Sequence, residues 1–466
     1  MRTFFLVISL SLFQQLFAQP LKQQLEAAVS ALEKDEQLKH GSISLYVMNA
    51  VTGATVFGKN EQVGMAPASS QKVITSVTAF EILGKSYRYK TAFGYKGDIV
   101  FKKLQGALVV TASGDPTLGS WRWPGSSEKN IMQNVIKTLQ QKNIAQVSNG
   151  LLIEMQNWES QATPRGWTWE DMGNYYGAGA WALNWHENQY DLVLQPGKAI
   201  GDGVKILKTT PTLRGVTNLY NELKTGASNS GDNAVIYLPA YGTLGFVRGT
   251  VPAGKETFTI RGSMPLPYVA FRESLLSAAA ANGISIQNTD SLLPGKTAAK
   301  AVLVPLLTIQ SPAFDSMNYW FLRESLNLYG EAFIKTIALQ QKGFAATDSG
   351  LAILRYFWNS RGIDKSALNI IDGSGLSPAN RTTTHALVTV LQYARDKPWY
   401  PSFYNALPLM NGIRMKSGYI SGVRSYTGYL KSKAGVEYTF AFIVNNFDGS
   451  AGSVREKMWK LLDILK

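Results

Sequence analysis

The chain has 466 residues, of which 45% are hydrophobic and 17% are charged, a balance that indicates a globular protein and excludes a disordered one. This length predicts more than one domain. Cysteine is absent, which excludes disulfides and thiolate metal sites. The net charge of +14 favours an anionic partner, either a polymer or a membrane surface.

The N-terminal residues are MRTFFLVISLSLFQQLFA, with one cation, Arg2, followed by an apolar run and then by Ala18. That order is typical of a secretory signal peptide, and the run is shorter than the ~18 apolar residues of a membrane span. We therefore expect residues 1–18 to be removed and the protein to be exported to the periplasm. Nucleic acid is then not an expected partner.

Hydrophobic periodicity predicts the remaining elements in chain order. The expected helices cover residues 21–39, 69–83, 130–142, 268–282, 318–341, 349–362 and 453–465. The expected strands form a hairpin over 41–60 and two C-terminal runs over 424–432 and 436–447, with many short strands between 90 and 300. Because strands lie near both ends, we expect both ends to share one sheet and the middle to be an insertion.

A serine and a lysine three residues apart, Ser69 and Lys72, stand at the start of the second expected helix. Residues at this spacing are neighbours on a helix surface. A neutral or hydrogen-bonded lysine can take the serine proton, and the N–H groups of a helix start can hold a developing oxyanion. Alone this S-x-x-K pattern is weak, because it recurs by chance in long chains.

A second motif, Ser316-Met317-Asn318, has the form S-x-N, and a third, Lys416-Ser417-Gly418, has the form K-[ST]-G before the C-terminal strands. The three motifs in this order are typical of penicillin-binding proteins and class A β-lactamases.

Each of these residues has a chemical use. Ser316 and Lys416 can relay a proton to a leaving amine, while Asn318 can hold the amide of the substrate. Ser417 and Lys416 can bind a terminal carboxylate, and Gly418 allows a substrate backbone to approach the strand. We expect no metal and no organic cofactor.

The sequence resembles the class C low-molecular-mass penicillin-binding proteins, the D-alanyl-D-alanine carboxypeptidase/endopeptidase family, over essentially the whole mature chain. The stretches that carry the resemblance are PASSQKVITS, SGDPTL, DGSGLSPAN, KSGYISGVRSYTGYL and WTWEDMGNYYGAGAWALNWHEN. It implies an α/β (α+β) fold, a β-lactamase/transpeptidase-like domain with an antiparallel sheet flanked by helices, interrupted by two nested β-rich domains. We expect the catalytic domain over 19–90 and 305–466, an inserted domain over 91–180 and 265–304, and a nested domain over 181–264.

The resemblance also implies a reaction. Ser69 would attack the bond between the last two D-alanines of a peptidoglycan stem peptide or cross-bridge, and penicillin and other β-lactams would acylate the same serine as inhibitors. The backbone N–H groups of Ser69 and Tyr419 would hold the oxyanion, and Asp171 would lie near a substrate side chain. Tyr419 departs from the family pattern, which has a small hydroxyl residue there, so the mode of carboxylate binding stays open.

Two alternatives remain at this point. A β-lactamase-like or esterase hydrolase would use the same serine, although the large insertion is not needed for that activity. A catalytically inactive cell-wall-binding protein would keep the fold, although Lys72 and Lys416 are both present. Peripheral association with the membrane or cell wall is expected from the charge in each case.

Overall fold

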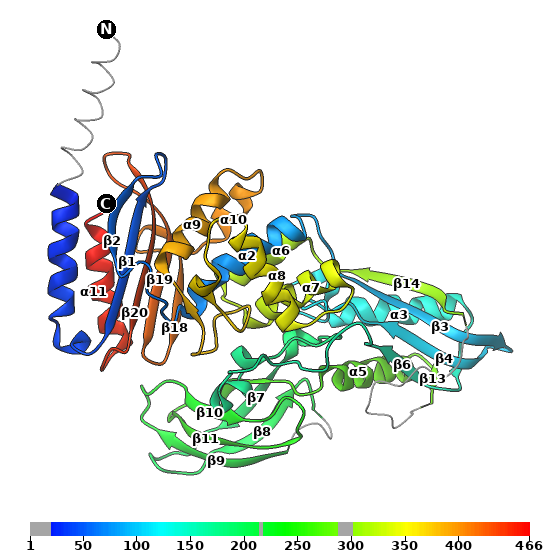
Figure 1. Ribbon diagram of the computed structural model, residues 1–466. Coiled ribbons are helices and arrows are strands. Elements are labelled where there is room, and N and C mark those ends of the chain that lie inside the picture. Colours follow the sequence, from blue (N-terminus) through cyan, green and yellow to red (C-terminus); the bar gives the residue numbers. More distant parts are fainter. Residues whose placement is uncertain (1–19, 214–217, 288–301) are drawn as a thin grey trace, which may run out of the picture. The chain divides into compact units, whose positions relative to one another are not determined.

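The computed structural model describes residues 20–213, 218–287 and 302–466 (Figure 1). The predicted signal peptide lies outside these residues. The chain divides into two compact units. The first contains the chain up to Ile82, Asn318–Leu326 and Leu351–Lys466, and the second contains Leu83–Met317 and Asn327–Gly350.

A six-stranded antiparallel sheet with the order β17-β18-β19-β20-β1-β2 forms the centre of the first unit. Its strands are β1 (Ser42–Asn49), β2 (Thr55–Lys59), β17 (Leu409–Met410), β18 (Ile413–Ile420), β19 (Val423–Lys431) and β20 (Glu437–Asn445). Because β1 pairs with β20, the two ends of the chain share one sheet, as the sequence predicts. The interior of β20 is buried throughout, which explains why its residues are apolar apart from Thr439.

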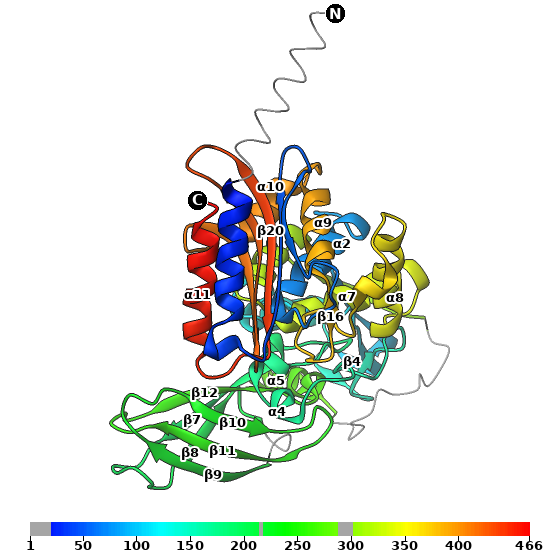
Figure 2. The same cartoon turned by 60° about the vertical axis from the view of Figure 1, so that its left-hand side comes forward.

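Helices cover both faces of this sheet. The helix over residues 20–33 and α11 (Ala451–Asp463) lie side by side, and they pack with Leu45 into one apolar core (Figure 1, Figure 2). On the opposite face, the Ser44 hydroxyl lies 2.7 Å from Thr384 Oγ1, at the start of α9 (Thr384–Arg395). Successive residues of β1 therefore contact different helices, as the alternation of a strand requires.

One helix that the sequence predicts as continuous is interrupted in the structure. The helix expected over 318–341 is two helices, α6 (Phe314–Arg323) and α7 (Asn327–Lys342). Between them Ser325 adopts a φ of 57°, a left-handed conformation that ends a helix. Of these two helices, α7 belongs to the second unit. The first unit also contains α2 (Lys72–Ile82), α10 (Tyr400–Ala406) and most of α8 (Thr347–Asn359), with the short strands β15 (Leu368–Asn369) and β16 (Arg381–Thr382). The sequence prediction missed α9 and α10.

The second unit is rich in strands. One sheet has the order β13-β5-β4-β3-β14, with β6 paired to β4, and two sheets of three strands have the orders β10-β11-β9 and β12-β7-β8. The first sheet contains β3 (Lys90–Val100), β4 (Lys103–Thr111), β5 (Gln146–Val147), β6 (Leu151–Glu154), β13 (Ser285–Ile286) and β14 (Val304–Gln310). The others contain β7 (Gln189–Gln195), β8 (Lys205–Thr210), β9 (Asn218–Gly226), β10 (Asn233–Tyr237), β11 (Leu244–Pro252) and β12 (Phe258–Ser263).

Among the described residues, the α-helices that lie wholly in this unit are α3 (Glu128–Gln141), α4 (Trp169–Met172), α5 (Pro267–Ala281) and α7. Apolar side chains of α3 and α5, among them Ile131 and Phe271, pack with those of the sheets in one core. The small sheets lie inside the range 181–264, but the nesting of one domain within another stays a prediction. Within the described ranges, no helix combines the length and the apolar character that a membrane crossing needs.

Candidate active site

Ser69 lies on a turn of 3₁₀-helix, Ala68–Gln71, and Lys72 is the first residue of α2. The sequence prediction of one continuous helix is therefore corrected in its first turn. Ala68 has a φ of 46°, which is unfavourable for a residue with a side chain. Gly375 packs so closely on this turn that a Cβ there would lie 2.0 Å from Ala68 O. Backbone strain held by its surroundings is typical of functional sites.

The side chains of Ser69 and Lys72 meet. Lys72 Nζ donates a hydrogen bond to Ser69 Oγ at 2.9 Å and another to Ser374 O at 2.7 Å. Lys72 is fully buried, whereas Ser69 is half-buried. The hydroxyl can therefore meet a ligand while the amine behind it stays away from water.

A loop that sequence reasoning left without a role holds the Ser374 carbonyl. The buried Asp372 carboxylate accepts the backbone N–H groups of Gly375 and Ser377, each at 2.7 Å. Gln71 Nε2 donates to Asp372 O at 2.7 Å, which ties the loop to the nucleophile turn. The signal was the D-G-S-G run, since aspartate and glycine are the residues that tight turns need.

The K-S-G motif lies on β18, beside this turn. A Cβ on Gly418 would lie 2.8 Å from Ser69 N and 2.6 Å from Pro67 O. Ser425 Oγ of β19 also donates to Pro67 O, at 2.5 Å. Gly418 is thus needed for the approach of the strand to the nucleophile turn, a reason that the sequence prediction did not include.

Lys416 is buried, and its Nζ donates to Ser417 O at 2.8 Å. Burial, and to a smaller extent the positive charge of Arg424, lowers the pKa of Lys416 to about 7. At this pKa the amine can gain or lose a proton near neutral pH.

The S-x-N motif lies in the first turns of α6. Ser76 Oγ donates to Asn318 Oδ1 at 2.6 Å, which directs the amide of the buried Asn318. Within the part of the chain that the structure describes, Asn318 Nδ2 is buried and has no hydrogen-bond partner. Ser316 is exposed, and its hydroxyl lies 3.3 Å from Asp315 Oδ1. Met317 is buried, so an apolar residue suits the middle position of the motif.

The last two predicted residues lie in different units. Tyr419 is 56% exposed on β18, and its ring centroid lies 5.6 Å from the guanidinium carbon of Arg424. Asp171 lies on α4 of the second unit, where Thr168 Oγ1 donates to Asp171 Oδ2 at 2.8 Å. Burial raises the pKa of the Asp171 carboxyl. The role of Asp171 stays a prediction.

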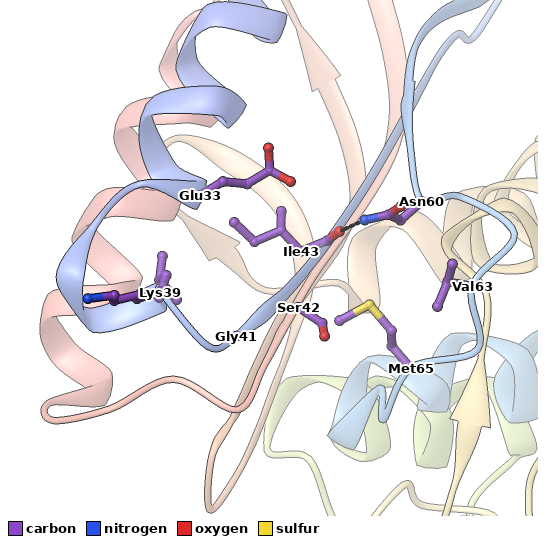
Figure 3. A pocket seen from close by; sticks show the side chains of 9 residues that line it. Glu33, Lys39, Gly41, Ser42, Ile43, Asn60, Val63 and Met65 are labelled. Atoms are coloured by element: carbon purple, nitrogen blue, oxygen red, sulfur yellow. Dashed lines mark hydrogen bonds between the residues drawn. The ribbon is translucent and has the colours of Figure 1, made fainter.

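A pocket of about 420 Å³ opens elsewhere in the first unit (Figure 3). Side chains at its wall include Glu33, Lys39, Asn60 and Met65, and none of the predicted site residues lines it. Among the described residues, no cluster of three histidine, aspartate or glutamate side chains could hold a metal ion.

The geometry as a whole defines a class. A serine hydroxyl bonded to a buried lysine, at the start of a helix and beside a glycine-bearing strand, is the arrangement of an acyl-transferring serine hydrolase that uses lysine as its base.

Comparisons with known proteins agree with this class. The model of the D-Ala-D-Ala carboxypeptidase 3 (S13) family matches residues 25–463. A D-alanyl-D-alanine carboxypeptidase from Actinomadura sp. (strain R39) is 24% identical, covering 92% of this chain and 82% of that protein. The D-alanyl-D-alanine carboxypeptidase DacB of Haemophilus influenzae is 21% identical, covering 92% and 91%.

The crystal structure of penicillin binding protein 4 (dacB) from Haemophilus influenzae shares the fold, with a TM-score of 0.77, 19% identity and coverage of 96% and 97%. A second structure of that protein, in complex with a β-lactam, has a TM-score of 0.71 and 17% identity, with the same coverage.

The chain belongs to the D-Ala-D-Ala carboxypeptidase 3 (S13) family. The family and the fold class predicted from the motifs are thereby confirmed, and the protein is an enzyme of the serine carboxypeptidase class.

Proposed function

We propose that this enzyme acts on peptidoglycan as a D-alanyl-D-alanine carboxypeptidase and D,D-endopeptidase, through an acyl-enzyme on Ser69. The observation that carries the proposal is the hydrogen bond of 2.9 Å from the buried Lys72 Nζ to Ser69 Oγ. A serine hydroxyl is a weak nucleophile, and a lysine amine in this position can take its proton as the oxygen attacks.

In the first half of the reaction, Ser69 Oγ attacks the carbonyl between the last two D-alanines, and its proton passes to Lys72. The backbone N–H groups of Ser69 and Tyr419 hold the oxyanion. This role is supported by the close approach of β18 at Gly418, where a Cβ would lie 2.8 Å from Ser69 N.

In the second half, Ser316 and Lys416 pass a proton to the departing amine, which belongs to D-alanine or to a cross-bridge. Water then hydrolyses the acyl-enzyme. Asn318 Nδ2, which is buried and available as a donor, binds the amide of the stem peptide. Asp171 contacts the side chain of the third stem residue, for which a group carrying an amine is suitable.

The site of action follows from the sequence features. The signal peptide directs export to the periplasm. The net charge of the chain is +14, or 46 − 1 − 32 = +13 once Arg2 is removed with the signal peptide, and it supports peripheral association with an anionic wall or membrane. β-Lactams acylate Ser69, and they act as inhibitors because this acyl-enzyme is hydrolysed slowly.

The test is the intact mass of the mature protein after incubation with benzylpenicillin. We expect one drug adduct on the wild type and none on Ser69→Ala. Ser70→Ala is the matched control, because Ser70 is buried and its hydroxyl donates to Pro67 O at 2.7 Å; it should keep the adduct.

Three results would contradict the proposal. An adduct on Ser69→Ala would identify a different serine. Intact drug without an adduct would favour an inactive cell-wall-binding protein, and hydrolysed drug without an adduct would favour a β-lactamase. If the adduct forms as expected, release of D-alanine and cleavage of cross-linked muropeptides would then be measured separately.

A further inference from the structure

Arg424 lies directly opposite Tyr419 in the antiparallel register of β18 and β19. Alternation along a strand places Ser417 and Tyr419 on one face of β18. Their cross-strand partners, Tyr426 and Arg424, share that face. The position where the family pattern has a small hydroxyl, and this chain has Tyr419, therefore has a guanidinium as its cross-strand neighbour.

The surroundings hold this guanidinium in place. Arg424 Nε donates to Tyr426 OH at 3.0 Å. The guanidinium carbon lies 5.4 Å from the ring centroid of Tyr426 and 5.6 Å from that of Tyr419, distances at which a cation and an aromatic ring attract. The planar head is therefore oriented before any ligand arrives.

The charges near Ser417 have no fixed counter-ion. In the described ranges, neither Arg424 nor Lys416 forms an ion pair with an aspartate or glutamate, although Lys416 is buried and Arg424 is half-buried. Buried charges are ordinarily paired. The charge of Arg424 also acts on Lys416, whose pKa it lowers. Two cations without a carboxylate partner among the described residues therefore flank Ser417 in the paired strands, since Lys416 precedes it in β18 and Arg424 lies opposite Tyr419, two residues further on.

We propose that Arg424 binds the carboxylate carried by the leaving residue of the substrate, together with Ser417 and Lys416. Arg424 would take the role of the small hydroxyl residue that the family pattern has at the position of Tyr419. A guanidinium is suited to this task because it binds a carboxylate through two parallel hydrogen bonds. The inference rests on the proposed function, since it names the group that selects the leaving residue. It makes Arg424 a specificity-determining residue.

The test compares two synthetic peptides, diacetyl-Lys-D-Ala-D-Ala with a free carboxylate and the same peptide as its C-terminal amide. The readout is the ratio of their kcat/KM values. We expect Arg424→Gln to lower this ratio at least about 30-fold, the effect of removing one partner of a charge-assisted pair. Lys431→Gln, which removes a cation from the other end of β19, should leave the ratio unchanged.

Two further variants separate binding from packing. Arg424→Lys keeps the charge but not the paired donors, so it should keep an intermediate ratio, and it also serves if Arg424→Gln does not fold. Adding Tyr419→Ser to Arg424→Gln restores a small hydroxyl and should recover part of the ratio. Thermal unfolding of each variant is also measured, to show whether a change in the ratio comes from a loss of folding.

The outcomes are distinguishable. An equal loss for both peptides in Arg424→Gln, or a wild type that does not discriminate between acid and amide, would overturn this inference and leave the proposed function intact. A wild type that hydrolyses neither peptide and forms no penicillin adduct would overturn the proposed function, and the inference with it.

Discussion

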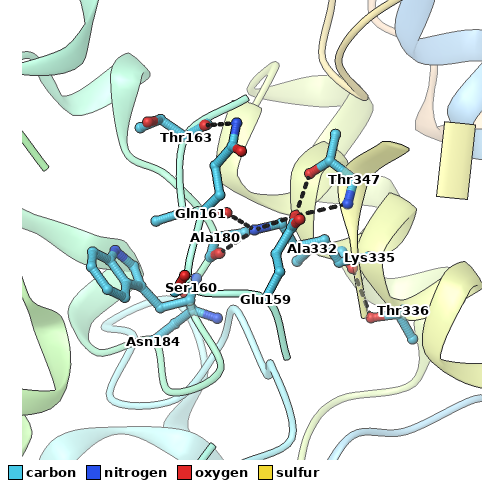
Figure 4. Close-up of polar contacts among 12 residues, drawn as sticks. Glu159, Ser160, Gln161, Thr163, Ala180, Asn184, Ala332, Lys335, Thr336 and Thr347 are labelled. Atoms are coloured by element: carbon cyan, nitrogen blue, oxygen red, sulfur yellow. Dashed lines mark hydrogen bonds and ion pairs between the residues drawn. The ribbon is translucent and has the colours of Figure 1, made fainter. Parts of the chain in front are cut away.

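Two buried lysines, one in each unit, show how the same residue type serves different purposes. Lys335 of the second unit lies on α7, and its Nζ is 3.2 Å from Glu159 Oε1 and donates to Ala180 O at 2.9 Å (Figure 4). Lys416 of the first unit is buried to a similar degree, yet its Nζ donates to the carbonyl of Ser417 and has no carboxylate partner in the described part of the chain.

The electrostatics differ accordingly. Burial lowers the pKa of Lys335, but the Glu159 carboxylate opposes the shift. Burial and the positive charge of Arg424 act in the same direction on Lys416 and together lower its pKa to about 7. The Lys335 amine is paired with the Glu159 carboxylate within the fold, whereas the unpaired Lys416 keeps a charge that a substrate can meet and a proton that it can exchange. The difference lies in the partners, because burial is the same.

The largest expected effect tests whether Lys72 is the base. We expect Lys72→Met to slow acylation by benzylpenicillin about 10³-fold or more, because Ser69 would lose its proton acceptor. The measurement is the second-order rate of adduct formation. Lys39→Met, at an exposed position of the same unit, should acylate at the wild-type rate. A variant at Lys72 that keeps a tenth of the rate would assign the base to another group.

The unpaired state of Lys416 predicts a dependence of stability on pH. In the folded protein the pKa is about 7, and in the unfolded chain it is the ordinary value near 10.5, so the unfolded state binds more protons between these limits. Below pH 7 the buried charge of Lys416 therefore lowers the free energy of unfolding by its full amount. This penalty fades as the pH rises to about 10.5.

Compared with the wild type, Lys416→Met should be more stable at pH 6, by about 5 kcal/mol at most, and the advantage should shrink towards pH 10. Urea unfolding of both proteins at several pH values measures the difference. A difference that stays constant with pH would mean that the Lys416 pKa is not shifted.

Removing the lysine of the paired site should lower the stability of the protein, whereas removing Lys416 should raise it. Lys335→Met leaves Glu159 next to Thr347, whose N–H it accepts at 2.7 Å, without the neighbouring cation. We expect a loss of about 2 kcal/mol, below the usual cost of a buried unpaired charge because Glu159 is 20% exposed. Urea unfolding measures the loss, and adding Glu159→Gln should recover most of it. If Lys335→Met were stabilising, the contrast with Lys416 would disappear.

The smallest expected effect concerns the approach of β18 to the nucleophile turn. Gly418→Ala should slow acylation roughly tenfold, because its Cβ would displace Ser69 N or Pro67 O. Gly64→Ala is the control, since a Cβ there would meet only Arg381 Cβ at 3.5 Å. Rates of benzylpenicillin acylation for both variants provide the comparison; equal rates would show that the close approach is not needed for reaction.

The sequence by itself determined the features that depend on neighbours along the chain. Ser69 and Lys72 meet because a spacing of three is a contact on any helical turn, whether 3₁₀ or α. The strands at both ends were readable from their apolar runs, and the order of the three motifs indicated the family. Local periodicity did not reveal the break at Ser325, because a left-handed residue leaves no mark in the apolar pattern.

Only the tertiary structure decided which distant groups complete the site. The Ser374 carbonyl reaches Lys72 from a loop held by Asp372, and Ser76 directs Asn318 from another helix. The pairing of Arg424 with Tyr419 depends on the register of two strands. Such contacts are set by the packing of separate elements or by the register of a strand pair, and the periodicity of the sequence encodes neither.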